Sequence, residues 1–116
     1  MAGNRNDSIW MIPVNETLEK NGHDYLIRNI EITPLTYFVD YETTDGFDPF
    51  GDDCLRMKFI MKDGSVLERN TILTGSVGKE GQWSTFHDLI KLEQLETVSV
   101  ENLEIPVEEY GMLIED

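Results

Sequence analysis

Hydrophobic and polar residues alternate with a period of two along much of the chain, which is the pattern of β-strands that bury one face. The segment 55–62 shows this most clearly. Its apolar residues share one phase: Leu55, Met57, Phe59 and Met61. Its basic residues share the other phase and predict a basic stripe on the exposed face: Arg56, Lys58 and Lys62. Asp63-Gly64 then predicts a type I′ hairpin turn, after which residues 65–73 form the returning strand.

Two more strands are expected upstream, joined by a second hairpin signal. Residues 14–20 and 23–33 carry the strand pattern, and Asn21-Gly22 lies between them. Pro34 removes a ladder hydrogen-bond donor, which predicts a bend or a sheet edge before a strand at 35–42. Because that strand has aromatic residues in both phases, we expect it to be covered on both faces or to lie at an edge beneath a loop.

The rest of the chain is predicted to form shorter elements. The content of Gly, Pro and Asp predicts a loop at 43–53, and three glycines predict another at 74–82. Residues 87–95 have near-helical spacing over about two turns and predict a short helical turn. Three short strands are expected in the last third of the chain: 83–86, 97–101 and 103–107. In the last of them, Pro106 favours an edge position.

The number and spacing of these strands predict the fold class. About seven short strands separated by turn signals indicate an all-β, immunoglobulin-like antiparallel β-sandwich with one short helical turn. An antiparallel barrel is the alternative. A chain of 116 residues builds a single core. We therefore expect an N-terminal segment or linker at 1–12, the sandwich domain at 13–108 and an acidic C-terminal tail at 109–116.

Composition restricts the classes of partner. The formal net charge at pH 7 is −14, from 9 Lys and Arg against 23 Asp and Glu. The hydrophobic share of 40 % is too high for a disordered acidic tail, so the charge is carried by a folded body. Nucleic acid and anionic lipid are both bound through clustered Lys and Arg, so neither is an expected partner.

Cysteine content and the termini bear on the compartment. Cys54 is the one cysteine of the sequence, so an intramolecular disulfide, a Cys-based zinc site and a CxxC redox pair are excluded. The sequence has no apolar run of eighteen residues and no signal-peptide pattern at its start. Taken as a complete chain it is expected in the cytoplasm. Taken as a domain excised from an anchored parent, it is expected at the extracytoplasmic face of the membrane.

The acidic loop is the candidate metal site. Calcium takes six to eight oxygen ligands, which an Asp-rich loop with glycine can supply. The acidic residues of the loop and its approach lie between Asp40 and Asp53, and the calcium candidates among them are Asp45, Asp48, Asp52 and Asp53. Their spacing differs from the EF-hand pattern. The competing interpretation is a solvated loop that keeps an acidic domain soluble.

Four other residues or groups carry candidate chemistry. Ser84, His87 and Asp88 have the residue types of a catalytic triad, but no nucleophile elbow surrounds the serine. We interpret Asp88 instead as a cap for the following turn. His23 is expected as a surface turn residue. Cys54 shares the phase of the basic stripe and is expected on the wetter face as an inert thiol. Trp10 precedes the first expected strand and either folds back on the sandwich, which we favour, or serves as an exposed docking segment.

The order of the motifs suggests a family. The matching motifs run in this order: an extended segment at 14–20, Asn21-Gly22, a strand at 25–32, Thr33-Pro34, the hairpin Lys62-Asp63-Gly64-Ser65, and the segments 88–100 and 103–107. Over about residues 14–107 this order resembles the extracytoplasmic immunoglobulin-like domains of membrane-bound anti-sigma-factor-like proteins of Gram-positive bacteria. The resemblance implies that the chain corresponds to the outer module alone. It assigns no functional residue.

These observations lead to a functional expectation. The chain is expected to be a non-enzymatic protein-interaction or envelope-sensing module that binds a protein partner through an acidic sandwich surface, without a cofactor. Edge strands beside Pro34 or Pro106 are candidate sites for strand addition. A calcium-stabilised adhesion-like domain using the loop 40–53 and a cytoplasmic binding protein are the alternatives. A small hydrolase using Ser84 and His87 is a further class.

Overall fold

The computed structural model describes residues 8–49, 53–70, 74–86 and 89–114. In these residues ten strands form two antiparallel sheets that face each other, which confirms the predicted all-β sandwich. The helical elements are a 3₁₀ turn at Leu92–Gln94, within the segment where a helical turn was expected, and the short helix α1 (Val107–Tyr110). Within the described part of the chain, no helix has the length and apolar character that a membrane crossing requires.

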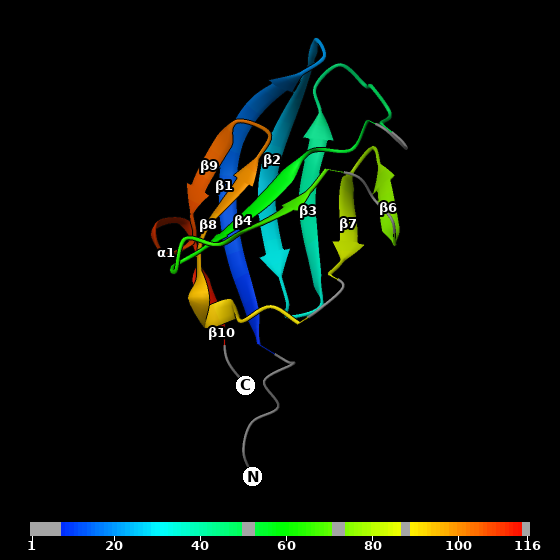
Figure 1. Cartoon of the computed structure of the whole chain (residues 1–116). Coiled ribbons are helices and arrows are strands. Elements are labelled where there is room, and N and C mark those ends of the chain that lie inside the picture. The colour runs from blue at the N-terminus through cyan, green and yellow to red at the C-terminus, as the bar shows by residue number, and fades with distance from the viewer. Residues whose placement is uncertain (1–7, 50–52, 71–73, 87–88, 115–116) are drawn as a thin grey trace.

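The larger sheet has six strands in the order β10-β1-β2-β3-β7-β6 (Figure 1). Their bounds are β1 (Ile9–Lys20), β2 (His23–Ile32), β3 (Thr36–Thr43), β6 (Gly75–Gly78), β7 (Gly81–Thr85) and β10 (Met112–Ile114). Asn21 and Gly22 join β1 to β2 with φ angles of 55° and 82°, and Lys20 pairs with His23. Positive φ at both central residues is the geometry of a type I′ turn, so this hairpin is confirmed.

The smaller sheet has the order β5-β4-β8-β9. Its strands are β4 (Met57–Met61), β5 (Val66–Arg69), β8 (Leu95–Val100) and β9 (Leu103–Pro106). The expected β4–β5 hairpin is confirmed, but its turn is not type I′, because Gly64 has a φ of 91° while Asp63 is outside the positive-φ region. The N–H of Gly64 donates to the Met61 oxygen at 2.9 Å, and the N–H of Met61 donates to the Ser65 oxygen at 2.9 Å. This is a three-residue loop in which glycine takes the left-handed position.

The core lies between the sheets. Figure 1 shows β4 and β8 crossing in front of β1, β2 and β3, with β7 and β6 to one side. The alternation predicted along 55–62 is confirmed, since Leu55, Met57 and Phe59 are buried while Arg56 and Lys58 are exposed. Fully buried large side chains come from both sheets, among them Tyr25, Tyr37, Tyr41, Ile30, Leu95 and Ile105.

Both ends of the chain belong to the larger sheet, which corrects the expected boundaries. The first strand begins at Ile9, not at residue 14, and Trp10 pairs with Leu113 of β10 and with Ile32 of β2. The segment 1–12 is therefore not wholly a linker, and 109–116 is not wholly a tail. Trp10 is 5 % exposed and its indole N–H donates to the Leu92 oxygen at 2.8 Å, so it folds onto the sandwich as favoured.

One local expectation was wrong, and one pair of alternatives is decided. The glycine-rich segment 74–82, predicted as a loop, contains strand β6 and the start of β7, which pair as a hairpin. At Pro34 the bend alternative is confirmed, since residues 34 and 35 form a bend. The following strand is not at an edge, because β3 lies between β2 and β7. Pro106, by contrast, does lie in an edge strand, β9.

Candidate functional site

Two aromatic side chains stay exposed on the outward face of the larger sheet. Phe38 of β3 and Trp83 of β7 are direct register partners, and they are 37 % and 42 % exposed. Directly opposed residues on one face of an antiparallel pair have neighbouring side chains. The residues that flank Phe38 in β3, Tyr37 and Val39, point inward and are buried. We call the surface formed by Phe38, Trp83 and the hollow beside them the aromatic face.

The hollow has a volume of about 620 Å³. Its lining comes from β3, β6, β7 and the connecting turn: Phe38, Glu42, Thr43, Ser76, Gly78, Lys79, Glu80, Gly81 and Trp83. Gly81 is a lining residue at a point where a side chain does not fit. A Cβ there would lie 2.6 Å from the Val39 oxygen and 3.1 Å from the Phe38 ring. The hydroxyl of Tyr41 donates to the Gly78 oxygen at 2.7 Å and anchors the β6–β7 hairpin to β3.

Charged side chains border the aromatic face. Glu42 and Glu80 are exposed lining residues, and Lys79 lies beside them. Arg28 of β2 is shared by two carboxylates, at 2.8 Å from Asp40 and 3.7 Å from Glu42. Glu42 nevertheless keeps 55 % of its side chain exposed. The aromatic face therefore combines two accessible rings with two exposed carboxylates, Glu42 on β3 and Glu80 in the β6–β7 turn.

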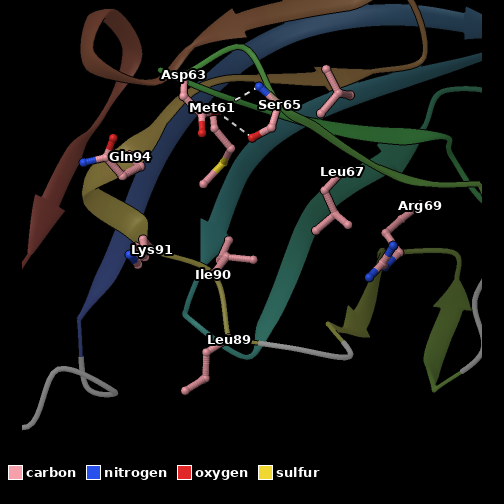
Figure 2. A pocket seen from close by; sticks show the side chains of 10 residues that line it. Met61, Asp63, Ser65, Leu67, Arg69, Leu89, Ile90, Lys91 and Gln94 are labelled. Carbon is pink, nitrogen blue, oxygen red and sulfur yellow. Dashed lines mark hydrogen bonds between the residues drawn. The ribbon is translucent and has the colours of Figure 1, made fainter.

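A second hollow, of about 520 Å³, lies beside the edge strand β5. Figure 2 shows Met61, Leu67 and Ile90 around it, with Leu89 and Arg69 towards its rim. At its upper side the N–H and hydroxyl of Ser65 both donate to Asp63, at 2.9 and 2.7 Å. Those hydrogen bonds close the β4–β5 turn, so Asp63 has a structural role here.

The acidic loop does not assemble the expected calcium ligands in the described residues. Asp45 instead contacts His23, with its Oδ2 at 2.6 Å from Nδ1, and accepts the Phe47 N–H at 3.0 Å. These hydrogen bonds lower the pKa of the Asp45 carboxyl. Asp48 is exposed and Asp53 is half-buried, while Asp52 lies outside the described residues. No three His, Cys, Asp or Glu side chains of the described segments come close enough together to hold a metal ion.

His23 has a role that the sequence did not predict. Its ring stacks on Phe47 with the centroids 3.8 Å apart and the planes at 6°. Together with the Asp45 contact, this stacking fixes the start of the acidic loop against the β1–β2 turn. Phe47 thus anchors the loop as expected, while Phe50, the other expected anchor, lies outside the described residues.

Ser84, the candidate nucleophile, and Cys54, the expected inert thiol, are both buried. Ser84 is 2 % exposed and its hydroxyl donates to the Thr74 oxygen at 3.0 Å. His87 and Asp88 lie outside the described residues. Cys54 is 2 % exposed and its thiol contacts the Asn70 oxygen at 3.4 Å, so its placement on the wetter face was wrong. The strand phase fails because β4 begins only at Met57.

Two of the three basic-stripe side chains face carboxylates of neighbouring elements. Lys58 lies 3.8 Å from Glu68 of β5, and Lys62 lies 3.7 Å from Glu108 of α1. All four side chains are more than 40 % exposed, between 44 % and 69 %, so these pairs are solvated and weak. The stripe is therefore partly compensated and is not a strong site for an anion.

Of these surfaces, the aromatic face has the features of a binding site. The sequence alone did not predict that Phe38 and Trp83 are paired, because they lie on different strands. It did contain one signal: Phe38 occupies the polar phase of its strand, which indicates an exposed ring. No protein-family model, no characterised protein and no solved structure matches the chain. The case for function therefore depends on the geometry of the chain's own surfaces.

Proposed function

We propose that this chain is a non-enzymatic protein-interaction module whose aromatic face binds a basic protein partner. The observation that carries the proposal is the exposed Phe38–Trp83 pair on the paired strands β3 and β7, beside a hollow. Aromatic residues are enriched at protein interfaces, and tryptophan is prominent among the residues that dominate binding energy. Most other aromatic rings of the described segments are buried in the core, which makes this exposed pair distinctive.

Charge supports a basic partner. The net charge of −14 attracts cationic proteins over long range and accelerates their encounter. At short range a guanidinium stacks on an indole and pairs with a carboxylate at the same time. Trp83 supplies the indole, and Glu42 and Glu80 supply the carboxylates. An arginine-containing segment therefore fits this site better than a lysine-containing one.

The proposal is tested with a fluorescein-labelled tetra-arginine peptide, whose binding is followed by anisotropy at low salt. We expect Trp83→Ala and Phe38→Ala each to weaken binding at least tenfold, because each removes one ring of the site. Leu35→Ala is the matched control, since Leu35 is 50 % exposed and lies outside the hollow. Tetra-lysine is expected to bind more weakly than tetra-arginine, and tetra-glutamate not to bind.

Two results would overturn the proposal. One is equal binding of tetra-arginine by Trp83→Ala and by the unmodified protein, because the aromatic face would then make no contribution. The other is equal loss in Leu35→Ala and Trp83→Ala, which would show that the loss is not specific to the aromatic face. Circular dichroism of each variant verifies that the sheets are intact.

The family resemblance supports a more specific proposal. If the chain is the outer module of an anti-sigma-factor-like protein, it binds the basic partner at the extracytoplasmic face of the membrane. There the module would sense conditions at the cell envelope. The alternative is a cytoplasmic binding protein. A membrane span encoded upstream in the same reading frame would support the first location. The immunoglobulin-like subclass finds no support in the strand order. Strands β1, β2 and β3 are consecutive neighbours in one sheet, whereas immunoglobulin domains order that sheet A-B-E-D.

A further inference from the structure

The four edge strands of the sandwich differ in how they are protected. An exposed edge offers unpaired backbone groups to other chains, and proteins commonly block it with charges, prolines or irregular backbone. Strand β9 carries Glu104 and Pro106, and β5 carries Glu68 and Arg69. Strand β6 begins at Gly75, whose φ is 154°. Strand β10, Met112–Ile114, is the shortest of the four at 3 residues, which itself limits the edge, but it carries no charge, proline or irregular backbone.

The β10 edge also exposes apolar side chains. Met112 is 64 % exposed and Ile114 is 47 % exposed, on the same face of the strand. Met11, the register partner of Met112 in β1, adds a third apolar side chain that is 37 % exposed. A chain with a net charge of −14 thus has, at one sheet edge, a short row of uncharged residues.

On its opposite face, β10 borders a hollow that is lined in part by acidic side chains. Leu113 packs beside Trp10, and the hollow, of about 390 Å³, begins there. Its charged lining consists of Glu93, Glu108 and Lys62. Glu108 lies 3.7 Å from Lys62 and keeps 69 % of its side chain exposed, so the hollow retains a net negative charge.

We propose that β10 accepts an extended segment of a partner protein as an added strand, and that this segment alternates apolar with basic residues. Side chains of a strand alternate between the two faces of a sheet. The apolar residues of the partner would cover Met112 and Ile114, and its Lys or Arg residues would reach Glu93 and Glu108. Backbone hydrogen bonds give affinity in this mode, and the alternate side chains give specificity.

Charge favours a partner protein over a second copy of this chain. Two copies paired at β10 would bring together two bodies of charge −14. The sequence also brackets β10 with Glu108 and Glu109 on one side and with Glu115 and Asp116 on the other. A basic segment is attracted by the same residues that would repel a second copy.

The test uses a fluorescein-labelled peptide of four Lys-Val repeats, with binding measured by anisotropy on the full chain. We expect the double variant Met112→Lys/Ile114→Lys to bind it at least tenfold more weakly. The matched control is Val66→Lys/Leu89→Lys, which adds the same charge at side chains that are 52 % and 58 % exposed beside the β5 edge. That control is expected to bind like the unmodified protein. All four positions are exposed, so the variants should fold.

Further probes separate strand addition from other modes of binding. Methylating alternate backbone nitrogens of the peptide removes hydrogen-bond donors but keeps its charge, and should abolish binding. Trp83→Ala should leave Lys-Val binding unchanged, so failure here is distinguishable from failure of the aromatic face. Unchanged binding of the methylated peptide would overturn the proposal, as would equal losses in both double variants. A dimer in sedimentation that Met112→Lys/Ile114→Lys dissociates would also overturn it, in favour of a second copy.

Discussion

Gln82 joins the two sheets through its side chain, and its replacement tests how the sandwich is held together. It belongs to β7 and is 0 % exposed. Its Oε1 accepts the N–H of Leu55 at 2.7 Å, and its Nε2 donates to the Leu55 oxygen at 3.0 Å. The same Nε2 donates to the Tyr37 hydroxyl at 3.2 Å. The Gln82 side chain thus pairs with both backbone groups of Leu55, as a neighbouring strand would. Leu55 lies just before β4, so this contact links the larger sheet to the start of the smaller one.

The perturbation is Gln82→Leu, which nearly keeps the side-chain volume and removes all three hydrogen bonds. The N–H and C=O of Leu55 are then buried without partners, which costs about 1–3 kcal/mol each. The added apolar contact offsets about 1 kcal/mol. We therefore expect the free energy of unfolding to fall by about 1–5 kcal/mol, a large part of the 5–15 kcal/mol typical of a domain.

Urea denaturation followed by tryptophan fluorescence measures this loss, with the slope m compared to verify that the folded state is equally compact. Gln94→Leu is the matched control, because Gln94 is an exposed glutamine and its replacement should change stability by less than about 0.5 kcal/mol. A loss below about 1 kcal/mol in Gln82→Leu, with m unchanged, would refute the reasoning, since the Leu55 groups would then have other partners.

Three further predictions follow from buried groups and close backbone contacts. Trp10→Phe removes the hydrogen bond to the Leu92 oxygen and should lower the free energy of unfolding by about 1–3 kcal/mol in the same urea assay. Burial raises the pKa of Tyr25 and of Tyr37 to about 12, so the folded state keeps both protonated above pH 10 while the unfolded chain ionises. Stability should therefore fall as the pH rises from 10 through 12, and absorbance at 295 nm should show the delayed ionisation. Gly81→Ala should weaken tetra-arginine binding, because its Cβ would lie 2.6 Å from the Val39 backbone oxygen and 3.1 Å from the Phe38 ring, so that the β3–β7 pairing beneath the aromatic face must shift.

Local patterns predicted the elements that depend on neighbouring residues. The type I′ turn at Asn21-Gly22 follows from two residues that tolerate positive φ, and β4 follows from strict alternation. The edge position of Pro106 follows from its missing N–H donor. In each case the physical cause lies within a few residues of the element, so a single sequence contains it.

The errors arose where a distant strand decides the local structure. Gly75 and Gly81 suggested a loop, yet both lie in strands where another backbone passes too close for a side chain. A Cβ on Gly75 would lie 2.0 Å from the Trp83 oxygen. Strand β10 could not be predicted alone, because three residues form a strand only when β1 is there to pair with them.

The sequence by itself determined that this is a folded, acidic all-β domain, because charge count, alternation and turn residues are properties of the chain; the two packed sheets decided for a sandwich over a barrel. Tertiary structure decided which surfaces can act. It placed Phe38 opposite Trp83, buried Gln82 between the sheets and made β10 an edge strand of the described sheet. Each of these depends on the register between strands that are distant in sequence, and register is set by packing the whole core.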